Sequence, residues 1–511
     1  MKTFYKYSVL LFTFALSACG DFLEPQSQSE YEPQLVQSLE ELLLGESYMG
    51  PGDGTLTPIL GVFDDDVALR PDFIKYSTSE EGKVNQIRLA FTWSKDMIDY
   101  LSGYNIYGTV YQKIVGCNAA LDYLDDVQGT EEQKNDVRAQ ALVLRSYFYF
   151  YLVNLYGKPY NYDKHALGVP LKLTSELISG GIARNTVEEV YNQIVGDLLE
   201  AERLLKTLPD SKKLRRNNRV SLPFTQLLLS RVYLYMENWE KALEYAELVM
   251  QDSYGFKLQD LNSIEEPNPY VTTPYPNYYT LDNPEILFLF DDLYGRIKFP
   301  LTMVLMESDK GFSSKCMCVV SEDLIKMYSN TDLRKSRYLV WERIGNGEEP
   351  NYRVAASKME VGQMYNPNIV SGSHWGTAFR LSEAYLNAAE AAAMLFKQKG
   401  DGNMVVKCKK YIDDLRQKRF APESFVAVET SNADELIKFA RDERRRELCF
   451  ENHRWFDLRR YGMPEIKHTW YDKSGETVEH VLADKDLGYT LLIPKEAFGL
   501  NPGLIQNESR K

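Results

Sequence analysis

The chain has 511 residues, which allows two to four domains or one large composite fold. Apolar residues make up 44% and charged residues 26%, close to ordinary globular averages, which excludes disordered, collagen-like and polytopic membrane proteins. The net charge is -14, and it falls to -16 once a leader that carries Lys2 and Lys6 is removed, so we expect no nucleic-acid partner.

The N-terminus has the pattern of a bacterial export leader. Lys2 and Lys6 form a positive region, residues 9–16 form a short apolar region, and two small residues precede Cys19. This end resembles the lipobox of bacterial lipoproteins, in which cleavage precedes a cysteine that becomes acylated. We therefore expect a signal peptide at residues 1–18 and lipidation of Cys19, with more than one acyl chain giving durable anchoring.

Two acidic residues follow the lipidation candidate. Asp21 and Glu24 resemble the signal that sends some lipoproteins to the outer face of a Gram-negative outer membrane. The expected location is thus the outer membrane, lipid-anchored and exposed at the cell surface. The alternative is an ordinary secretory leader with a chance cysteine.

The remaining cysteines are too few and too scattered for a disulfide framework. Cys316 and Cys318 are two residues apart and would share one face of a strand, but no histidine or further cysteine lies near them to complete a metal site. We predict structural roles and no metal for all five: Cys117, Cys316, Cys318, Cys408 and Cys449.

Helical periodicity dominates the first half of the mature chain. Residues 104–127 and 131–156 have helical apolar spacing, and the aromatic run 147–151 requires the second segment to bury more than one face. Thr186, followed by two glutamates, is typical of an N-cap, and this helix ends before Pro209.

A helix pair over residues 221–251 has tetratricopeptide spacing. Residues 229–234 read L-S-x-x-Y-L and are followed by the small residues Ala242 and Ala246. Residues 381–386 repeat the same L-S-x-x-Y-L and precede another helical segment. We therefore predict a mainly α fold: a tetratricopeptide-like helical-repeat scaffold with long loops and a few short strands.

Two regions lack this periodicity. Residues 263–284 contain five prolines and four tyrosines, which predicts a long aromatic loop that leads into a strand candidate at 285–290. Residues 49–108 are similarly rich in glycine and loop signals. Long loops inside a compact fold are usually functional.

The segment 441–462 is the most distinctive stretch of the sequence. Its arginines are interleaved with acids at helical spacing, while Trp455 and Phe456 supply apolar contacts. A phosphate site is one interpretation of the basic run. Because the acids nearly cancel the charge, we favour a structural ion-pair network beneath a packed helix.

At this point the sequence resembles the SusD/RagB lipoproteins, partners of TonB-dependent outer-membrane transporters. Five motifs carry the resemblance: E-R-R-R-E-L-x-F-E-x-x-R-W-F-D-L-R-R-x-G at 443–462, F-R-L-S-E-A-Y-L-N-A-A-E-A at 379–391, R-x-x-A-x-x-L-R-S-Y-x-Y-F at 138–150, N-P-E-I at 283–286, and D-F-L at 21–23 after the cysteine. They follow the family's order over nearly the whole mature chain. The early loops match no single member, which leaves the ligand open.

The resemblance implies a helical lid that hinges over a SusC-like barrel transporter and captures nutrient oligomers without hydrolysing them. Most of the family binds oligosaccharides, and RagB-like branches bind peptides. It implies a SusD-like N-terminal helical region with ligand loops at 19–260, a loop-rich insertion at 261–376 and a C-terminal helical SusD/RagB region at 377–511.

The resemblance also suggests where the ligand binds, in the loops after the first helices and in the loops before the late repeat. Flat sugar faces suit Tyr and Trp, and vicinal hydroxyls suit Asp and Arg. A packing role is the alternative for each candidate. The ligand-binding candidates are Asp66, Arg70, Trp93 and Tyr104 from the first region and Tyr275, Tyr278 and Tyr279 from the second.

Two rival classes have less support. A glycoside hydrolase needs two carboxylates at a set separation, which counting cannot exclude, but the five histidines are scattered without H-E-x-x-H, and G-x-S-x-G and P-loop motifs are absent from the sequence. A purely structural repeat adaptor would leave the aromatic loops without a role. We expect binding without catalysis and without a cofactor.

Overall fold

The computed structural model describes residues 33–48, 60–73, 75–97, 106–216, 218–270, 278, 282–289, 303–308, 311–342, 351–355 and 378–510. The leader, Cys19 and the acidic residues after it lie outside this range, as do three of the ligand-binding candidates, Tyr104, Tyr275 and Tyr279.

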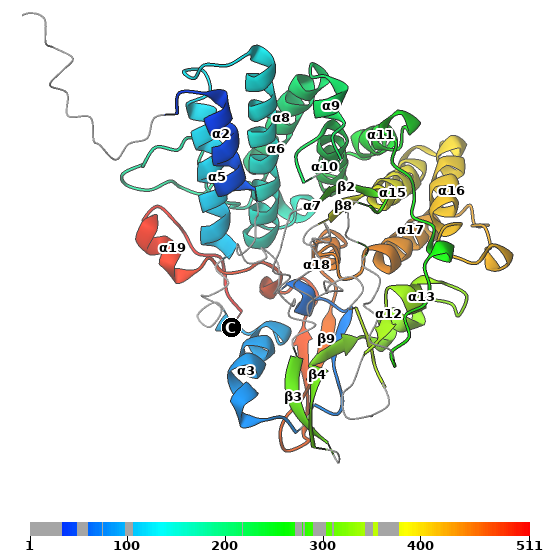
Figure 1. Cartoon of the computed structure of the whole chain (residues 1–511). Coiled ribbons are helices and arrows are strands. Elements are labelled where there is room, and N and C mark those ends of the chain that lie inside the picture. The colour runs from blue at the N-terminus through cyan, green and yellow to red at the C-terminus, as the bar shows by residue number, and fades with distance from the viewer. Residues whose placement is uncertain are drawn as a thin grey trace, which may run out of the picture.

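A row of helices forms the upper part of the molecule in Figure 1. In chain order these are α2 (Val36–Leu42), α5 (Ile106–Asp122), α6 (Glu131–Tyr156), α8 (Val187–Lys206), α10 (Leu222–Tyr235), α11 (Trp239–Val249), α15 (Leu381–Lys399), α16 (Gly402–Arg416) and α17 (Ala433–Leu448). Neighbours pack in sequence, with α5 on α6, α6 on α8, α10 on α11, α11 on α15, and α15 on α16 and α17. The prediction of a mainly α repeat scaffold is confirmed.

Local capping signals fix where two of the longest helices begin. Thr130 and Gln133 form a reciprocal capping box at the start of α6, and Thr186 and Glu189 form another at the start of α8. The aromatic run 147–151 is buried completely, as its composition predicted. α6 therefore buries more than one face in the helical layer.

The two L-S-x-x-Y-L copies lie against each other in the fold. Ser230 on α10 donates a hydrogen bond to the carbonyl oxygen of Ala242 on α11 (2.9 Å) and accepts one from Asn387 on α15 (3.1 Å). Small residues at these positions let the helix backbones approach closely. Arg231 and Glu383 add a buried ion pair between the same two copies.

Short antiparallel strand pairs and short helices complete the fold, and the strands of residues 303–316 and 466–471 lie in the lower part of Figure 1. The strands pair as β1 (Val67–Leu69) with β5 (Cys318–Val320), β2 (Ile286–Leu289) with β8 (Ala378–Arg380), β3 (Met303–Ser308) with β4 (Gly311–Cys316), β6 (Val340–Trp341) with β7 (Arg353–Val354), and β9 (Ile466–Tyr471) with β10 (Thr477–Leu482). The short helices are α3 (Glu81–Phe91), α7 (Tyr160–Asp163), α9 (Asp210–Lys213), α12 (Glu322–Lys326), α13 (Arg334–Arg337), α18 (Arg454–Arg460) and α19 (Lys495–Leu500). The strand expected at 285–290 is β2.

The early loops and the loop-rich insertion meet in the β1–β5 strand pair. β1 comes from the early loops and β5 from the insertion, with Val67 opposite Val320. Residues far apart in sequence thereby share one surface, and β9 packs beside β1.

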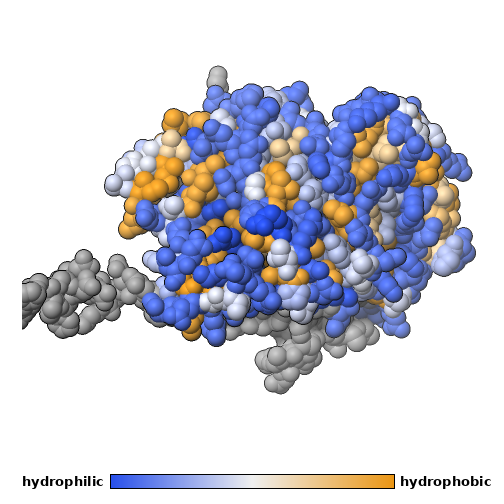
Figure 2. Space-filling model, turned by 90° about the horizontal axis from the view of Figure 1, so that it is seen from above, coloured by the Kyte–Doolittle hydropathy of each residue, from blue (hydrophilic) through white to orange (hydrophobic). Residues whose placement is uncertain are grey.

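The outer surface of the helical layer is mostly polar. Figure 2 views it from above and shows hydrophilic residues over most of the face, with apolar residues in separate patches. Among the described residues, no helix is both long and apolar enough to cross a membrane.

Candidate functional site

The C-terminal motif is a buried ion-pair network, as its interleaved charges predicted. Arg444 pairs with Asp457 at 2.8 Å, and Arg460 pairs with Glu390 at 2.7 Å. Burial alone would raise the pKa of Glu390, but the neighbouring arginines Arg460 and Arg441 lower it to about 2. These arginines are committed to internal carboxylates, which removes the phosphate-site interpretation.

Three consecutive aspartates of the early loop join this network. The carboxylates of Asp64, Asp65 and Asp66 lie within 4.8 Å of one another, a spacing that a cation would tolerate. Arg454 binds Asp65 through two nitrogens (2.7 and 2.8 Å), and Arg445 binds Asp66 at 2.7 Å. Burial and the neighbouring Asp66 carboxylate raise the pKa of Asp64 well above its usual range. The cluster is thus neutralised by arginines, and we assign it no metal.

Arg70, a ligand-binding candidate, also binds carboxylates of the protein itself. Its guanidinium donates to both carboxylate oxygens of Glu342 (2.9 and 3.0 Å) and to Asp72 at 2.6 Å. Asp66, another candidate, is equally buried by its bond to Arg445. Both side chains are held by internal ion pairs, and their role as ligand contacts stays a prediction.

The structure buries both aromatic candidates that lie within the described residues. Trp93 is 2% exposed, its indole N–H donates to the carbonyl oxygen of Phe63 (2.9 Å), and its ring stacks on His468 with centroids 4.3 Å apart. Tyr278 packs edge-on against Tyr338 at 4.9 Å. Neighbouring side chains therefore cover both rings, and the role of Trp93 and Tyr278 as ligand contacts stays a prediction.

Two partly exposed tyrosine rings lie near the buried Arg70 instead. The guanidinium lies 4.7 Å from the ring centroid of Tyr352, and the carboxylate side chain of Asp72 is 43% exposed. Tyr471 is also partly exposed and lies close enough to Tyr352 to interact with it electrostatically. We call Asp72, Tyr352 and Tyr471 the Arg70 surface.

Three different segments of the chain build the Arg70 surface. Asp72 follows β1, Tyr352 precedes β7, and Tyr471 ends β9. Burial and the neighbouring Asp72 carboxylate raise the pKa of Tyr352, so its hydroxyl stays neutral and can donate or accept hydrogen bonds.

Sequence signals for these residues are weak. Asp72 lies two positions after Arg70, within the early loop region that was already expected to bind ligand. Tyr352 and Tyr471 lie in segments without any recognised pattern, and only the fold brings them beside Arg70.

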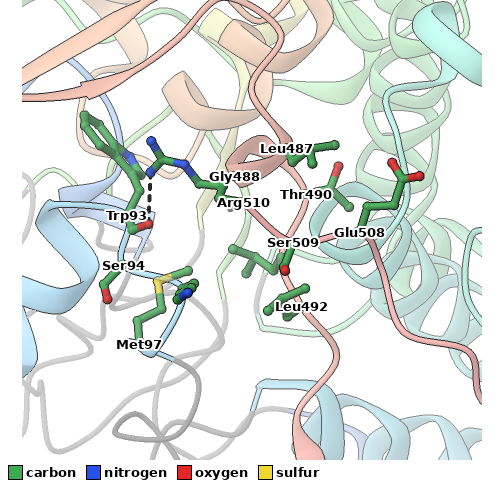
Figure 3. Close-up of a pocket in the computed structure, with 12 residues that line it drawn as sticks. Trp93, Ser94, Met97, Leu487, Gly488, Thr490, Leu492, Glu508, Ser509 and Arg510 are labelled. Carbon is green, nitrogen blue, oxygen red and sulfur yellow. Dashed lines mark hydrogen bonds between the residues drawn. The ribbon is translucent and has the colours of Figure 1, made fainter.

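A separate pocket lies between residues 93–97 and the C-terminal segment, as Figure 3 shows. It is partly open to solvent, and apolar side chains such as Met97 and Leu491 line it. Arg510 donates a hydrogen bond to the carbonyl oxygen of Trp93 (3.2 Å) across this pocket.

Comparison with known proteins decides the family. Residues 319–509 match the family model described as the SusD family, and residues 60–234 match the model described as starch-binding associating with outer membrane. Together these matches span more than two thirds of the chain. The chain belongs to the SusD/RagB family.

Similar sequences to this SusD/RagB-family protein occur in Formosa agariphila. SusD-like protein P25 is 22% identical over 449 residues, covering 78% of this chain and 77% of the relative. SusD-like protein P2 is 25% identical over 384 residues, covering 70% of each.

Solved structures share the fold over nearly the whole length. A putative sugar binding protein from Bacteroides vulgatus is 26% identical with a TM-score of 0.67, covering 94% of this chain and 100% of its own. A SusD superfamily protein from Bacteroides thetaiotaomicron is 22% identical with a TM-score of 0.66, covering 93% and 100%. A laminarin-binding SusD-like protein is 19% identical with a TM-score of 0.63, covering 94% and 100%.

Proposed function

We propose that this protein is a cell-surface lipoprotein that binds oligosaccharides and passes them to a SusC-like TonB-dependent transporter in the outer membrane. The chemistry of the Arg70 surface carries the proposal. Partly exposed tyrosine rings match the apolar faces of sugars, while Asp72 accepts hydrogen bonds from vicinal hydroxyls. The names of the relatives, which include sugar-binding and laminarin-binding proteins, agree with this ligand class.

Isothermal titration of the purified protein against a panel of oligosaccharides and peptides tests the ligand class. Tyr352→Ala and Tyr471→Ala should each weaken binding of the cognate oligosaccharide by about thirtyfold, equivalent to about 2 kcal/mol per aromatic anchor. Asp72→Asn should weaken it less, because an amide oxygen still accepts hydrogen bonds. Tyr162→Ala is the matched control, since this tyrosine is exposed on α7, away from the Arg70 surface.

Normal binding by both tyrosine variants would refute the site. A peptide ligand is the alternative, and it predicts affinity that falls clearly between low and moderate salt because charged contacts are screened. Affinity for a neutral oligosaccharide should change little. Release of reducing ends during incubation would instead indicate a glycoside hydrolase.

The candidates first chosen from the sequence are tested in the same titration. Trp93→Ala and the double change Tyr278→Ala with Tyr279→Ala remain predicted to weaken binding. Because Trp93 and Tyr278 are buried, we expect their replacement to lower the melting temperature as well. Loss of binding without loss of stability is expected only for the tyrosines of the Arg70 surface.

Delivery to a transporter is tested in cells of the source organism. A tagged copy of the protein should co-purify with a barrel transporter after mild detergent extraction. Purification of the protein alone, under conditions that preserve other outer-membrane complexes, would contradict the proposed partner.

A further inference from the structure

Arg459 differs from every other arginine of the C-terminal motif. The others each contact a carboxylate at 2.6 to 2.9 Å: Arg441, Arg444, Arg445, Arg446, Arg454 and Arg460. Within the described part of the chain, no carboxylate pairs with Arg459. Its Nη2 donates to the carbonyl oxygen of Gly157, while Nε and Nη1 are buried without a hydrogen-bond partner there. The residue is 1% exposed, so water at the surface does not solvate these groups.

A second unpartnered donor lies one helical turn away. Trp455 precedes Arg459 by four positions on α18, which places both side chains on the same face of the helix. The indole nitrogen of Trp455 is also buried without a hydrogen-bond partner among the described residues. Its ring stacks on Tyr489 at 4.9 Å, and Arg459 Nη2 lies 3.5 Å from Thr490 Oγ1. Both donors therefore pack against the same turn.

The charge of Arg459 remains uncompensated by these neighbours. Burial lowers its pKa to about 10, which still leaves the guanidinium charged at neutral pH. The groups that interact with it electrostatically are the phenols of Tyr191, Tyr235 and Tyr489. Burial raises the pKa of each phenol, so all three are neutral at the same pH. A buried charge without a counterion is strongly destabilising.

We propose that Trp455 and Arg459 bind a small monovalent anion of the halide class. The unpartnered groups are hydrogen-bond donors, so the ligand must accept hydrogen bonds, and the unpaired guanidinium calls for one negative charge. A large anion does not suit a site enclosed by buried aromatic rings. The anion would hold α18 against the end of α6 and the turn at Tyr489 and Thr490.

The pocket of Figure 3 provides a route to this site. Thr490 lines that pocket and its Oγ1 lies 3.5 Å from Arg459 Nη2, so the wall of the pocket contacts the guanidinium. A small ion can exchange past one threonine side chain more readily than a sugar or a phosphate ester can.

Bromide exchange tests the site directly. Crystals of the protein grown with sodium bromide should show an anomalous bromine peak within hydrogen-bonding reach of Trp455 Nε1 and Arg459. In solution, the melting temperature in sodium bromide should exceed that in sodium gluconate of equal ionic strength by about 2 °C. Equal melting temperatures, or a water without anomalous signal at this position, would overturn the proposal.

Three variants test whether the higher melting temperature in bromide depends on Trp455 and Arg459. Arg459→Met removes the charge and should abolish the bromide response. Trp455→Phe keeps an aromatic ring and removes one donor, so the bromide concentration for half-maximal stabilisation should rise about tenfold. Arg203→Met is the matched control, an exposed arginine on α8 paired with Glu200, and it should keep the full response.

If Arg459→Met fails to fold, the bromide response of Trp455→Phe tests the proposed anion site. An unchanged bromide response in Trp455→Phe, or a peak that appears only at molar bromide, indicates an adventitious ion only and overturns the assignment.

Discussion

The buried ion pair between Arg231 and Glu383 joins the two repeat copies, and its effect on the free energy of unfolding can be measured. Arg231 Nε and Nη2 each lie 2.6 Å from a carboxylate oxygen of Glu383, and the two side chains are 4% and 1% exposed. Glu383→Gln keeps the shape of the side chain but leaves the guanidinium buried without a counter-charge. Removing one partner of such a pair costs about 3 to 5 kcal/mol of unfolding free energy. The Phe379 ring, 4.1 Å from the guanidinium, offsets only a small part of this cost.

Urea denaturation measures this loss, and a double variant separates its causes. Replacing both Arg231 and Glu383 by methionine removes the charges together, so we expect this protein to be more stable than Glu383→Gln. Glu244→Gln is the control, because its pair with Lys241 is about half exposed and should contribute less than about 1 kcal/mol. If Glu383→Gln unfolds at the wild-type urea concentration, or the double variant is the least stable, the argument from buried charge is wrong.

Three further predictions follow from burial, pKa and the leader. Trp455→Ala should lower the free energy of unfolding by about 3 to 5 kcal/mol, because the ring is fully buried, and an unchanged melting temperature would contradict this role. Arginine neighbours lower the pKa of both Glu390 and Glu443 to about 2 in the folded protein, against 4.5 as the ordinary value. The stability from these carboxylates is therefore complete above pH 4.5 and is lost as the pH falls toward 2, which unfolding curves between pH 2 and 7 would measure. Cys19→Ala should release the protein from the membrane fraction, and continued membrane association of the unacylated variant would count against lipid anchoring.

The helical layer was predictable because its signals are local. Thr130 with Gln133, and Thr186 with Glu189, start helices through contacts three residues apart, and the sequence displays such spacing directly. The repeated L-S-x-x-Y-L likewise indicated two related helix pairs. The contact of Arg231 with Glu383 was not predictable, since it joins residues 152 positions apart.

The candidate site was harder to predict because exposure depends on distant partners. Trp93 has the residue type of a sugar platform, but His468 from β9 covers its ring. Arg70 was expected to face the ligand, but its guanidinium is buried and donates hydrogen bonds to Glu342 of the insertion. Tyr352 lies partly exposed beside Arg70 for the same reason: the insertion folds back onto the early loops. Composition and position cannot show which aromatic ring is covered.

The pairing of β2 with β8 has an evolutionary consequence. The chain leaves the helical layer after Leu289 and returns at Ala378, and these two residues lie opposite each other in the strand pair. Arg380 secures this junction through ion pairs to Glu285 and Glu447. Because the entropy of closing a loop rises only by about 0.6 kcal/mol per doubling of its length, the intervening segment can lengthen, shorten or be exchanged at little cost. The same helical scaffold can thus acquire new ligand preferences when the segment between β2 and β8 is replaced, because the strand pair already holds the two ends of that segment together.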